Sequence, residues 1–598
     1  MCGVFGIVFQ KEREDLGQIM VQAAHSLTYR GYDSVGCAAI SAEGLIDLRK
    51  DIGRVEEVDA KYGLSGMRGI RGLVQLRWAT FGVPAQRNSQ PHLDCDGDLV
   101  GAHNGNVINT ISLREQYLEE GHTVRGENDG EIVVHAVERH FDRLGDLPGA
   151  IMAAVGDLKG DYAYVISHQA ENAIYAVKMG SSLYLGVGEG FVCVSSDLPS
   201  ILELTSNIVT IRDGEFLRFG YDQYQLFDIR SGQVIERSPE RSQHTKESAH
   251  KGGHAHFMIK EIREQPEKVA NLLHFLEESA ELPRFTEVLR KAGRLFLVGS
   301  GTSYHACLVG SYFFSKLAGL AAIPVPAGAM VEQYGDSLRP DDVLLCVSQS
   351  GETKDVINVL NYCERRRLGQ VLAFVNVLGS TLSLRSRHFL PLVSDLEISV
   401  PATKTFTNQL VLFLAVANAL AGGGKVNLPA IPHLIERTLA QTEPRIRQLA
   451  QELLQVNDFY FLGYGLTHGI AYEGALKTKE VVYNHCEGAY SSEFKHGPLA
   501  IVYPGYPVIF ISTVEDAEMV SSHINEVSCR LGRVITVAPP QPLLEKYSSD
   551  FIALPVEDYF HVPIAATIPL QLLAYYMSVG RGIDPDFPRN ISKTLTVD

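Results

Sequence analysis

Phe296-Leu-Val-Gly299-Ser-Gly301-Thr-Ser303 is an apolar run that ends in a glycine-rich polar loop. The pattern returns 164 residues later (463 − 299) as Tyr460-Phe-Leu-Gly463-Tyr-Gly465-Leu-Thr467. Two further pairs of segments repeat at similar distances. They are Val343-Leu-Leu-Cys-Val-Ser348 with Val508-Ile-Phe-Ile-Ser-Thr513, displaced by 165 (508 − 343), and Gln409-Leu-Val-Leu with Gln571-Leu-Leu-Ala. A near-constant displacement across three separated segments predicts a duplicated domain.

The duplicated region has the pattern of a parallel α/β sheet. From about residue 285, short apolar runs alternate with amphipathic helical stretches, which is typical of α/β folds. We place the first copy at 285–430, the second at 431–587 and a C-terminal tail at 588–598. The apolar run Leu410 to Ala421 is shorter than the roughly 20 residues that a membrane helix needs, so it predicts a buried helix.

The first 238 residues follow a different pattern, in which short apolar runs are separated by Gly, Asp and Asn. Runs such as 72–76, 162–166 and 191–194 predict strands of an antiparallel α+β domain. A polar, Gly-containing segment follows, and we expect a linker and a connecting helix over 239–284. Four histidines in this segment lack a regular ligand spacing, so no metal site is expected there.

Composition limits the possible partners. The chain of 598 residues carries a net charge of −17, which argues against nucleic-acid binding but not against a small anionic substrate. Nine cysteines without a C-x-x-C pair fit a reducing compartment. The chain begins without a charged and apolar leader, so we expect a cytoplasmic protein that does not enter a membrane.

Cys2 is the first candidate for chemistry. Once Met1 is removed, this residue carries both a thiol nucleophile and a free α-amine, whose unperturbed pKa is about 7.7–8.0, so the amine can act as the base. Position alone also fits a chance cysteine at the start of a buried strand.

Residues that could assist such a nucleophile follow in the same domain. Attack on an amide needs donors for the developing oxyanion, and the Asn104 side chain beside the Gly105 N–H supplies two. Arg77 offers a fork for a carboxylate and Asp129 a counter-charge for an ammonium group. The simpler readings are a hairpin turn at Asn104-Gly105 and plain core packing of Trp78.

These motifs occur in one order: Cys2-Gly3, Tyr29-Arg30-Gly31-Tyr32-Asp33-Ser34, Arg77-Trp78-Ala79-Thr80, His103-Asn104-Gly105 and the Asp129 segment. The order resembles the class II glutamine amidotransferases, N-terminal-nucleophile (Ntn) enzymes with an αββα sandwich. Nearly the whole chain resembles the isomerising glutamine–fructose-6-phosphate aminotransferase family. The resemblance implies Cys2 as nucleophile, Asn104 and Gly105 as oxyanion hole, Arg77, Thr80 and Asp129 as glutamine ligands, Arg30 as a brace, and Trp78 as the gate of an ammonia tunnel.

The chain departs from the family pattern at several positions. Phe81 and Gln90 stand where the family usually has histidine, and Ile108 where it has glutamate. The usual Thr-Asp-Thr-Glu becomes Asn128-Asp129-Gly130-Glu131. Ala402 replaces a serine that touches the sugar in the family. These changes bear on three properties: the affinity for glutamine, the coupling between the domains, and the identity of the ketose.

Two loops of the first copy, 299–303 and 348–353, each end an apolar run and open a helix. Backbone N–H groups and hydroxyls at a helix N-terminus favour anions, and the absence of a Walker lysine pattern favours a monophosphate over a nucleotide. Simple N-capping is the alternative. The loops resemble the sugar isomerase (SIS) phosphate site, which implies Ser348, Gln349, Ser350 and Thr353 as ligands, with Thr302 and Ser303 near the sugar.

Glu473, Lys477 and Glu480 have the i, i+4, i+7 spacing of one helix face. An exposed salt-bridged stripe has the same spacing. Ketose–aldose isomerisation needs a base that moves a proton between C1 and C2, and a lysine can activate the ketone as an imine. The family resemblance implies Glu480 as base, Lys593 as imine lysine, and His496 from a neighbouring subunit for ring opening, with Glu473 and Lys477 in support.

The resemblance therefore implies synthesis of glucosamine 6-phosphate from L-glutamine and fructose 6-phosphate by a homodimer, and no metal or organic cofactor is expected. A paralogue that aminates another ketose phosphate or deglycates a fructosamine phosphate remains open because of Phe81, Gln90 and Ala402. A non-catalytic sugar-phosphate sensor is the more distant alternative. Retention of Cys2, Glu480 and Lys593 together argues against it.

Overall fold

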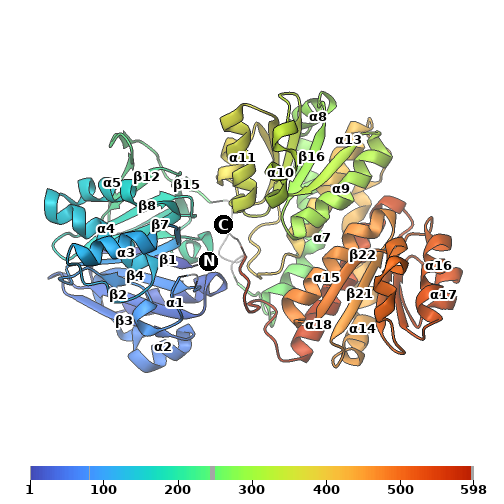
Figure 1. The fold of residues 1–598 in the computed structure, drawn as a ribbon, viewed down its shortest axis with the longest axis horizontal. Helices are drawn as coiled ribbons and strands as arrows, with labels where there is room; N and C mark the ends of the chain where they lie inside the picture. Colours follow the sequence, from blue (N-terminus) through green and yellow to red (C-terminus); the bar gives the residue numbers. More distant parts are fainter. Residues whose placement is uncertain (1, 80, 243–249, 594–598) are drawn as a thin grey trace. The chain divides into compact units, whose positions relative to one another are not determined.

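The computed structural model describes residues 2–79, 81–242 and 250–593. The chain divides into two compact units, one formed by residues 1–250 with 592–598 and the other by residues 251–591 (Figure 1). Each unit has its own sheets and its own core.

The first unit contains two sheets whose neighbouring strands run antiparallel. The eight-stranded sheet has the order β15-β11-β9-β10-β1-β4-β2-β3, and the seven-stranded sheet β14-β13-β12-β8-β7-β6-β5. The strands of the eight-stranded sheet are β1 (Gly3–Arg13), β2 (Ser34–Ile40), β3 (Ile46–Ile52), β4 (Gly69–Arg77), β9 (Tyr184–Gly188), β10 (Phe191–Ser195), β11 (Asn207–Thr210) and β15 (Glu240–Arg241). Those of the seven-stranded sheet are β5 (His92–Leu93), β6 (Leu99–Val107), β7 (Gly160–His168), β8 (Ile174–Met179), β12 (Glu215–Phe219), β13 (Tyr224–Asp228) and β14 (Val234–Ile235).

Alternation along β1 shows how the layers form. Phe5 and Ile7 pack against a helical layer, whereas Val4 and Val8 face a core between the two sheets, as the two-residue period of a strand requires. The first helical layer consists of α1 (Leu16–Leu27), α2 (Val55–Tyr62) and α6 (Leu198–Leu202). The second sheet is covered by α3 (Thr110–Glu119), α4 (Asp129–Leu144) and α5 (Leu147–Asp157). The predicted αββα sandwich is confirmed.

The second unit contains two parallel five-stranded sheets with the same topology. Their orders, β17-β16-β18-β19-β20 and β22-β21-β23-β24-β25, are both 2-1-3-4-5 in chain order, the flavodoxin-like arrangement. The strands of the first are β16 (Leu295–Gly299), β17 (Ala322–Pro326), β18 (Val343–Ser348), β19 (Gln370–Val375) and β20 (His388–Pro391). Those of the second are β21 (Asp458–Gly463), β22 (His485–Tyr490), β23 (Pro507–Ile511), β24 (Arg533–Ala538) and β25 (Asp550–Ala553). The predicted duplication is confirmed.

Strand register corrects the displacement inferred for the second repeated segment. Gly299 lies opposite Val347 in the first sheet, and Gly463 lies opposite Ile511 in the second. The displacement is therefore 164 in both strands (511 − 347), one less than the sequence comparison predicted for this segment. The two apolar runs could be aligned in either way because buried parallel strands are apolar throughout and carry no alternating pattern.

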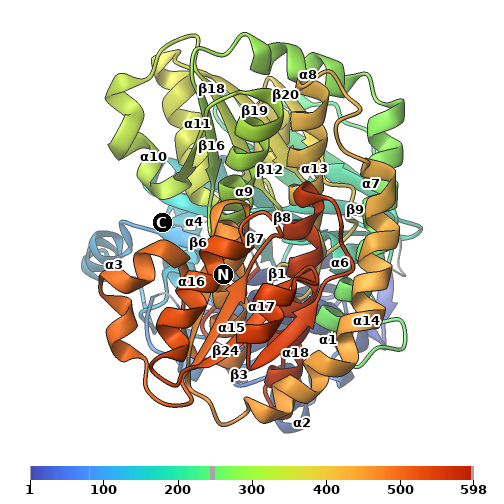
Figure 2. The same ribbon diagram turned by 90° about the vertical axis from the view of Figure 1, so that its right-hand side faces the viewer.

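One core joins the two copies. Leu295 and Leu297 of β16 share it with Phe459 and Phe461 of β21, while Phe296 and its neighbours on the other face pack outward. Helices in the shared core are α7 (Phe257–Glu278), α8 (Glu281–Arg290), α9 (Thr302–Ala318), α13 (Lys404–Leu420), α14 (Ile431–Glu452), α15 (His468–Val482) and α18 (Val562–Gly580). The outer faces are covered by α10 (Ala327–Tyr334), α11 (Lys354–Arg366) and α12 (Thr381–Arg385) on the first copy, and by α16 (Ala517–Ser528) and α17 (Pro542–Tyr547) on the second (Figure 2).

The segment expected to be a linker contributes to both units. Strand β15 pairs with β11 and so extends the first unit beyond residue 238. Helix α7 buries Met258, Ile262 and Val269 in the core of the second unit, so the connecting helix is part of that fold.

Two apolar helices lie inside the second unit. Helix α13 covers the run predicted to be a buried helix as far as Leu420, and the side chains of that run are buried from Leu410 to Asn418. Within the described part of the chain, one helical stretch, Tyr559–Gly580, is long and apolar enough to cross a membrane. Its most apolar window is 89% buried inside the protein, as in a core helix.

Candidate active sites

Cys2 lies directly before β1 and is buried. Its thiol accepts a hydrogen bond from the Trp78 N–H at 3.4 Å and donates to the Trp78 carbonyl at 3.5 Å. Burial raises the pKa of the Cys2 thiol above its usual value. The sulfur is therefore protonated at neutral pH and requires a base before it can attack.

The turn at residues 30–33 supports both segments around Cys2. Arg30 Nε donates to the Cys2 carbonyl at 3.3 Å, and Asp33 Oδ2 accepts from the Ala79 N–H at 2.8 Å. Gly31 is required because a Cβ there would lie 2.7 Å from the backbone carbonyl carbon of Arg77. The geometry supports the bracing role that the resemblance implies for Arg30.

Asn104 and Gly105 lie within β6, paired with Ala163 and Tyr162 of β7, so they do not form a hairpin turn. Asn104 is buried, and among the described residues neither polar atom of its side chain has a hydrogen-bond partner. Such a group is costly unless a ligand satisfies it. Gly105 has φ of 105°, and a Cβ there would lie 2.1 Å from the Asp161 carbonyl oxygen. The arrangement can present two donors to one oxyanion.

Asp129 begins α4, and Asn128 caps that helix by accepting from the Gly130 N–H. Asp129 Oδ2 accepts from the Val107 N–H at 3.2 Å and lies 3.2 Å from His103 Nε2. Burial alone would raise the pKa of Asp129, but interaction with His103 and the Val107 amide holds it below the usual value. A buried carboxylate that stays ionised suits an ammonium ligand.

Arg77, at the end of β4, is buried and donates to the carbonyls of Phe81, Gly82 (2.6 Å) and Val83 (3.4 Å). It also interacts electrostatically with Cys2 and Asp129. The structure thus brings Cys2, Arg77 and Asp129 into one site. Trp78 is half-buried there, and Thr80 lies outside the described residues.

The structure links two departures from the family pattern, Gln90 and Gly130, through His103. Gln90 Oε1 accepts from the His103 N–H at 2.8 Å, and Gln90 Nε2 donates to the His103 carbonyl at 3.2 Å. These bonds fix the amide orientation, so Gln90 Nε2 also points at His103 Nδ1 at 3.3 Å, while the other ring nitrogen of His103 lies 3.2 Å from Asp129 Oδ2. A Cβ at Gly130 would lie 2.4 Å from Gln90 Oε1, so Gly130 leaves the room that Gln90 uses.

In the second unit, Glu473, Lys477 and Glu480 line one face of α15. Glu473 is 2% and Lys477 1% exposed, so the alternative of an exposed stripe is wrong. Lys477 Nζ bonds Glu480 Oε2 and lies 3.4 Å from Glu473 Oε1. Burial alone would lower the pKa of Lys477, but the two carboxylates raise it above its usual value, and the lysine stays charged.

Two residues of α9 contact the same carboxylate. His305 Nδ1 lies 2.8 Å from Glu473 Oε2, and Thr302 Oγ1 donates to Glu473 Oε1 at 3.1 Å. Ser303 accepts a hydrogen bond from Gln409 on α13 at 3.1 Å. Sequence reasoning missed His305. Its only signal was a histidine two residues after Ser303, in the first turn of the helix that follows the loop.

The loop between β18 and α11 has hydroxyls at the start of a helix. The Ser348 and Thr353 hydroxyls lie 2.9 Å apart, and Ser348 Oγ accepts from the Gly351 N–H at 3.0 Å. Ser350 Oγ accepts from the Glu352 N–H at 3.2 Å, and the Gln349 carbonyl accepts from Asn376. Thr353 is the N-cap residue of α11, so the loop lies at the end of the helix dipole that favours an anion.

Three further residues were singled out in the sequence. His496 is exposed at the end of a short 3-10 helix, Ser491–His496. Lys593 groups with the first unit. Ala402 is half-buried in the loop before α13. The functional roles of His496 and Lys593 therefore rest on the family pattern.

Together the folds and sites define a class II glutamine amidotransferase joined to a tandem SIS protein. A glutamine amidotransferase domain model matches residues 76–203, and an SIS domain model matches residues 288–419 and 452–581. The glutamine–fructose-6-phosphate aminotransferase [isomerizing] of Pyrobaculum aerophilum is 39% identical over the full length of both chains. Those of Methanothermobacter thermautotrophicus and Clostridium tetani are 37% and 34% identical, again over both full lengths. The chain belongs to this family.

Solved structures resemble the second unit. The C-terminal domain of glucosamine-fructose-6-phosphate aminotransferase from Francisella tularensis matches with a TM-score of 0.51 and 29% identity, covering 57% of this chain and all of that one. A tagatose-6-phosphate ketose/aldose isomerase from Escherichia coli matches with a TM-score of 0.50 and 20% identity, covering 56% and 96%. At that identity the second match shows the shared fold alone.

Proposed function

We propose that this protein uses glutamine to convert fructose 6-phosphate into glucosamine 6-phosphate and glutamate. The observation that carries the proposal is that one chain holds both halves of the chemistry. A buried N-terminal thiol lies in one site with Arg77 and Asp129, and a buried Glu473–Lys477–Glu480 face shares a unit with the hydroxyl loop at 348–353. Family membership supports the same reaction.

In the first unit, the α-amine exposed by removal of Met1 takes the proton of the Cys2 thiol, and the sulfur attacks the carboxamide carbon of glutamine. Asn104 and the Gly105 N–H donate to the oxyanion that forms. Collapse of this intermediate releases ammonia, which leaves with the proton, and water then cleaves the thioester to give glutamate. Arg77 binds the carboxylate of glutamine and Asp129 its ammonium group.

In the second unit, the hydroxyls of Ser348, Ser350 and Thr353 bind the phosphate, with Gln349 beside them. His496, from a second subunit of a homodimer, opens the sugar ring, and Lys593 forms an imine with the ketone. Ammonia displaces the lysine, and Glu480 moves a proton from C1 to C2 to give the amino aldose. Ammonia and ketose phosphate combine with loss of one water, which balances the water used in glutamine hydrolysis.

Three further features belong to the proposal. Trp78 controls the passage of ammonia between the two sites, so that little is lost to solvent. The protein works in the cytoplasm, which is supported by nine free cysteines. Thr302 and Ser303 contact the sugar, and Ala402 lacks the hydroxyl with which the family serine touches it.

The test is an assay of purified protein with glutamine and fructose 6-phosphate that measures glutamate and glucosamine 6-phosphate together. We expect equal amounts of both products, and neither product from Cys2→Ala with glutamine. Ammonium salts should restore amino sugar formation in that variant, because the second unit is intact. Glutamate without amino sugar would point to another ketose phosphate. If neither product forms, the alternative of a non-catalytic sensor remains.

A further inference from the structure

Four metal-ligating side chains lie together in the first unit, outside the glutamine site. They are Cys95, His122, His135 and Glu138, and one ligand atom from each lies within 4.8 Å of all the others. We propose that these residues form a structural zinc site that fixes the start of α4. The sequence did not predict this site, because no metal was expected.

The distances between the ligand atoms are close to the edges of a zinc tetrahedron. Cys95 Sγ lies 3.6 Å from His122 Nδ1 and 3.9 Å from His135 Nδ1. The usual Zn–S and Zn–N bond lengths place such atoms about 3.5 Å apart. Glu138 Oε2 lies 2.8 Å from His122 Nδ1 and 2.6 Å from His135 Nδ1. In a tetrahedral zinc site the oxygen and nitrogen ligands are about 3.3 Å apart. A cation requires only a small expansion.

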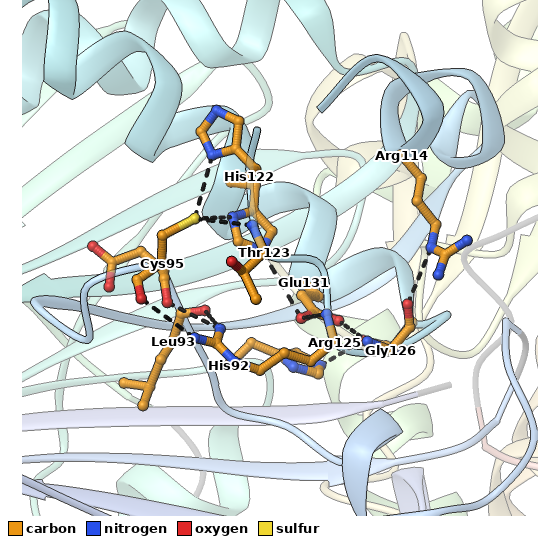
Figure 3. Close-up of polar contacts among 12 residues, drawn as sticks. His92, Leu93, Cys95, Arg114, His122, Thr123, Arg125, Gly126 and Glu131 are labelled. Carbon is orange, nitrogen blue, oxygen red and sulfur yellow. Dashed lines mark hydrogen bonds and ion pairs between the residues drawn. The ribbon is translucent and has the colours of Figure 1, made fainter. Parts of the chain in front are cut away.

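The four ligands come from three segments that fold together. Cys95 lies in the loop between β5 and β6, His122 in the connection between α3 and α4, and the other two on one face of α4 at i, i+3 spacing. The connection between α3 and α4 is held close to Cys95, because the Thr123 N–H donates to Cys95 Sγ at 3.2 Å. Figure 3 shows the Cys95 sulfur facing both the His122 ring and Thr123.

Outer contacts orient the ligands in the manner of a built site. The Cys95 N–H donates to Glu138 Oε1 at 2.8 Å, which leaves Oε2 directed at the two imidazoles. His135 Nε2 faces Glu131 Oε1 at 3.9 Å, which is beyond hydrogen-bonding distance. A carboxylate near the second nitrogen is nevertheless the usual neighbour of a metal-bound histidine. His135 and Glu138 are buried, which limits access of water.

The chemistry of the donor set favours zinc in a closed site. One sulfur, two imidazole nitrogens and one carboxylate oxygen suit the borderline-soft Zn²⁺ ion and do not suit Mg²⁺ or Ca²⁺, which prefer oxygen alone. Four protein ligands fill a tetrahedral shell and leave no position for water or substrate, as in structural rather than catalytic sites. The proposed site therefore takes no part in bond making.

The location gives the site a function. Helix α4 begins at Asp129, and the segment from His122 to Asn128 leads into it. Glu131, which faces His135, also accepts the N–H groups of Arg125 at 2.6 Å and Gly126 at 2.7 Å (Figure 3). A cation at the cluster would tie this segment to the β5–β6 loop. It would thereby hold Asp129 in place, as a positioning device for the glutamine site.

The experiment measures zinc in the purified full-length protein by mass spectrometry after dialysis against Zn²⁺ and then against metal-free buffer. We expect about one equivalent per chain in the parent protein. The zinc content of Cys95→Ser and of His122→Ala should be at least tenfold lower than that of the parent protein. Cys529→Ser changes an exposed cysteine elsewhere and should keep the parent zinc content. A chelator should lower the melting temperature of the parent protein and of Cys529→Ser but not of Cys95→Ser.

Cobalt substitution of the parent protein gives a test that does not depend on the folding of variants. We expect intense visible d–d bands of tetrahedral Co²⁺ together with a sulfur-to-cobalt charge-transfer band in the near ultraviolet. Zinc content that stays at background in the parent protein, or is equal in Cys95→Ser and Cys529→Ser, would overturn the proposal. A weak octahedral cobalt spectrum without charge transfer would do the same.

Discussion

The two SIS copies share one topology and differ at the loop after the central strand. In the first copy this loop is Ser348 to Thr353. With the displacement of 164, Val514 and Glu515 in the second copy stand where Ser350 and Gly351 stand in the first. Thr513 Oγ1 is already bonded to Asp516 at 2.7 Å. Carboxylates and an internal hydrogen bond make the second loop unfavourable for phosphate.

The helix that follows the first strand, α9 in the first copy and α15 in the second, carries its buried charged side chains in the second copy. Glu473 and Lys477 of α15 correspond to Val309 and Phe313 of α9, both fully buried and apolar. One copy therefore carries the hydroxyl-rich loop, while the other places ionisable groups on a buried helix face. This difference is what we expect if the duplication separated substrate binding from proton transfer, as we propose, while α9 and α15 still meet at Glu473.

The largest effect is expected from removing the proposed base. Glu480→Gln keeps the shape but cannot accept the C1 proton, so amino sugar formation should fall about 10²–10⁴-fold. The dissociation constant for fructose 6-phosphate, measured by calorimetry, should change little. Lys316→Gln alters the equivalent position of the first copy and serves as control. Similar activity in the two variants would remove Glu480 from the mechanism.

Stability should respond to the cation between the two glutamates. Lys477→Met leaves Glu473 buried without its lysine, and we expect a loss of about 3–5 kcal/mol in the free energy of unfolding. Urea denaturation measures it. Phe313→Leu, at the matching position of α9, should cost less than about 1.5 kcal/mol if the core repacks. Equal losses in both variants would show that packing, and not charge, dominates this helix face.

Phosphate binding should depend on the first copy alone. Ser350→Ala removes a hydroxyl from the proposed phosphate site, and we expect fructose 6-phosphate to bind about 10–100-fold more weakly, the usual cost of a hydrogen bond to a charged group. Val514→Ala changes the matching position of the second copy and should leave the dissociation constant unchanged. The comparison would fail if Val514→Ala weakened binding as much as Ser350→Ala.

A smaller effect concerns His468, which stands where the first copy has Tyr304. Burial lowers the pKa of His468 to about 4, and the nearby His305 adds to this. The unfolded chain then binds more protons between pH 6.5 and 4, so the stability that this group contributes is present above pH 6.5 and is lost as the pH falls. We expect a loss of about 1 kcal/mol between pH 7 and 5.5. His468→Gln should lack that loss, and an unchanged pH profile of stability would contradict the low pKa.

Much of the fold followed from the sequence because strand and helix periods are local signals. Short apolar runs such as 72–76 and 162–166 were sufficient for an antiparallel domain, and the repeated apolar runs were sufficient for the two α/β copies. The αββα layering was expected only from the family resemblance. The boundary near residue 238 was less predictable. β15 and α7 have polar or mixed compositions, and only their packing partners show to which unit they belong.

The candidate sites were predictable where family motifs are contiguous, as at Asn104-Gly105 or Ser348 to Thr353. Contacts between distant segments were missed. His103 and Gln90 are 13 residues apart and become a pair only through β6, and His305 meets Glu473 across two helices. Cys95 and His122 lie 27 residues apart without any metal-binding spacing. Only the His135-x-x-Glu138 spacing on α4 was visible in the sequence.

We propose that the first copy binds the phosphate and the second performs the proton transfer. A crystal structure of the full-length protein with fructose 6-phosphate tests it most directly. We predict the phosphate within hydrogen-bonding distance of Ser348, Ser350 and Thr353, and C1 and C2 of the sugar facing Glu480. Phosphate bound at Thr513 to Asp516 of the second copy, or a sugar remote from α15, would contradict this division of roles.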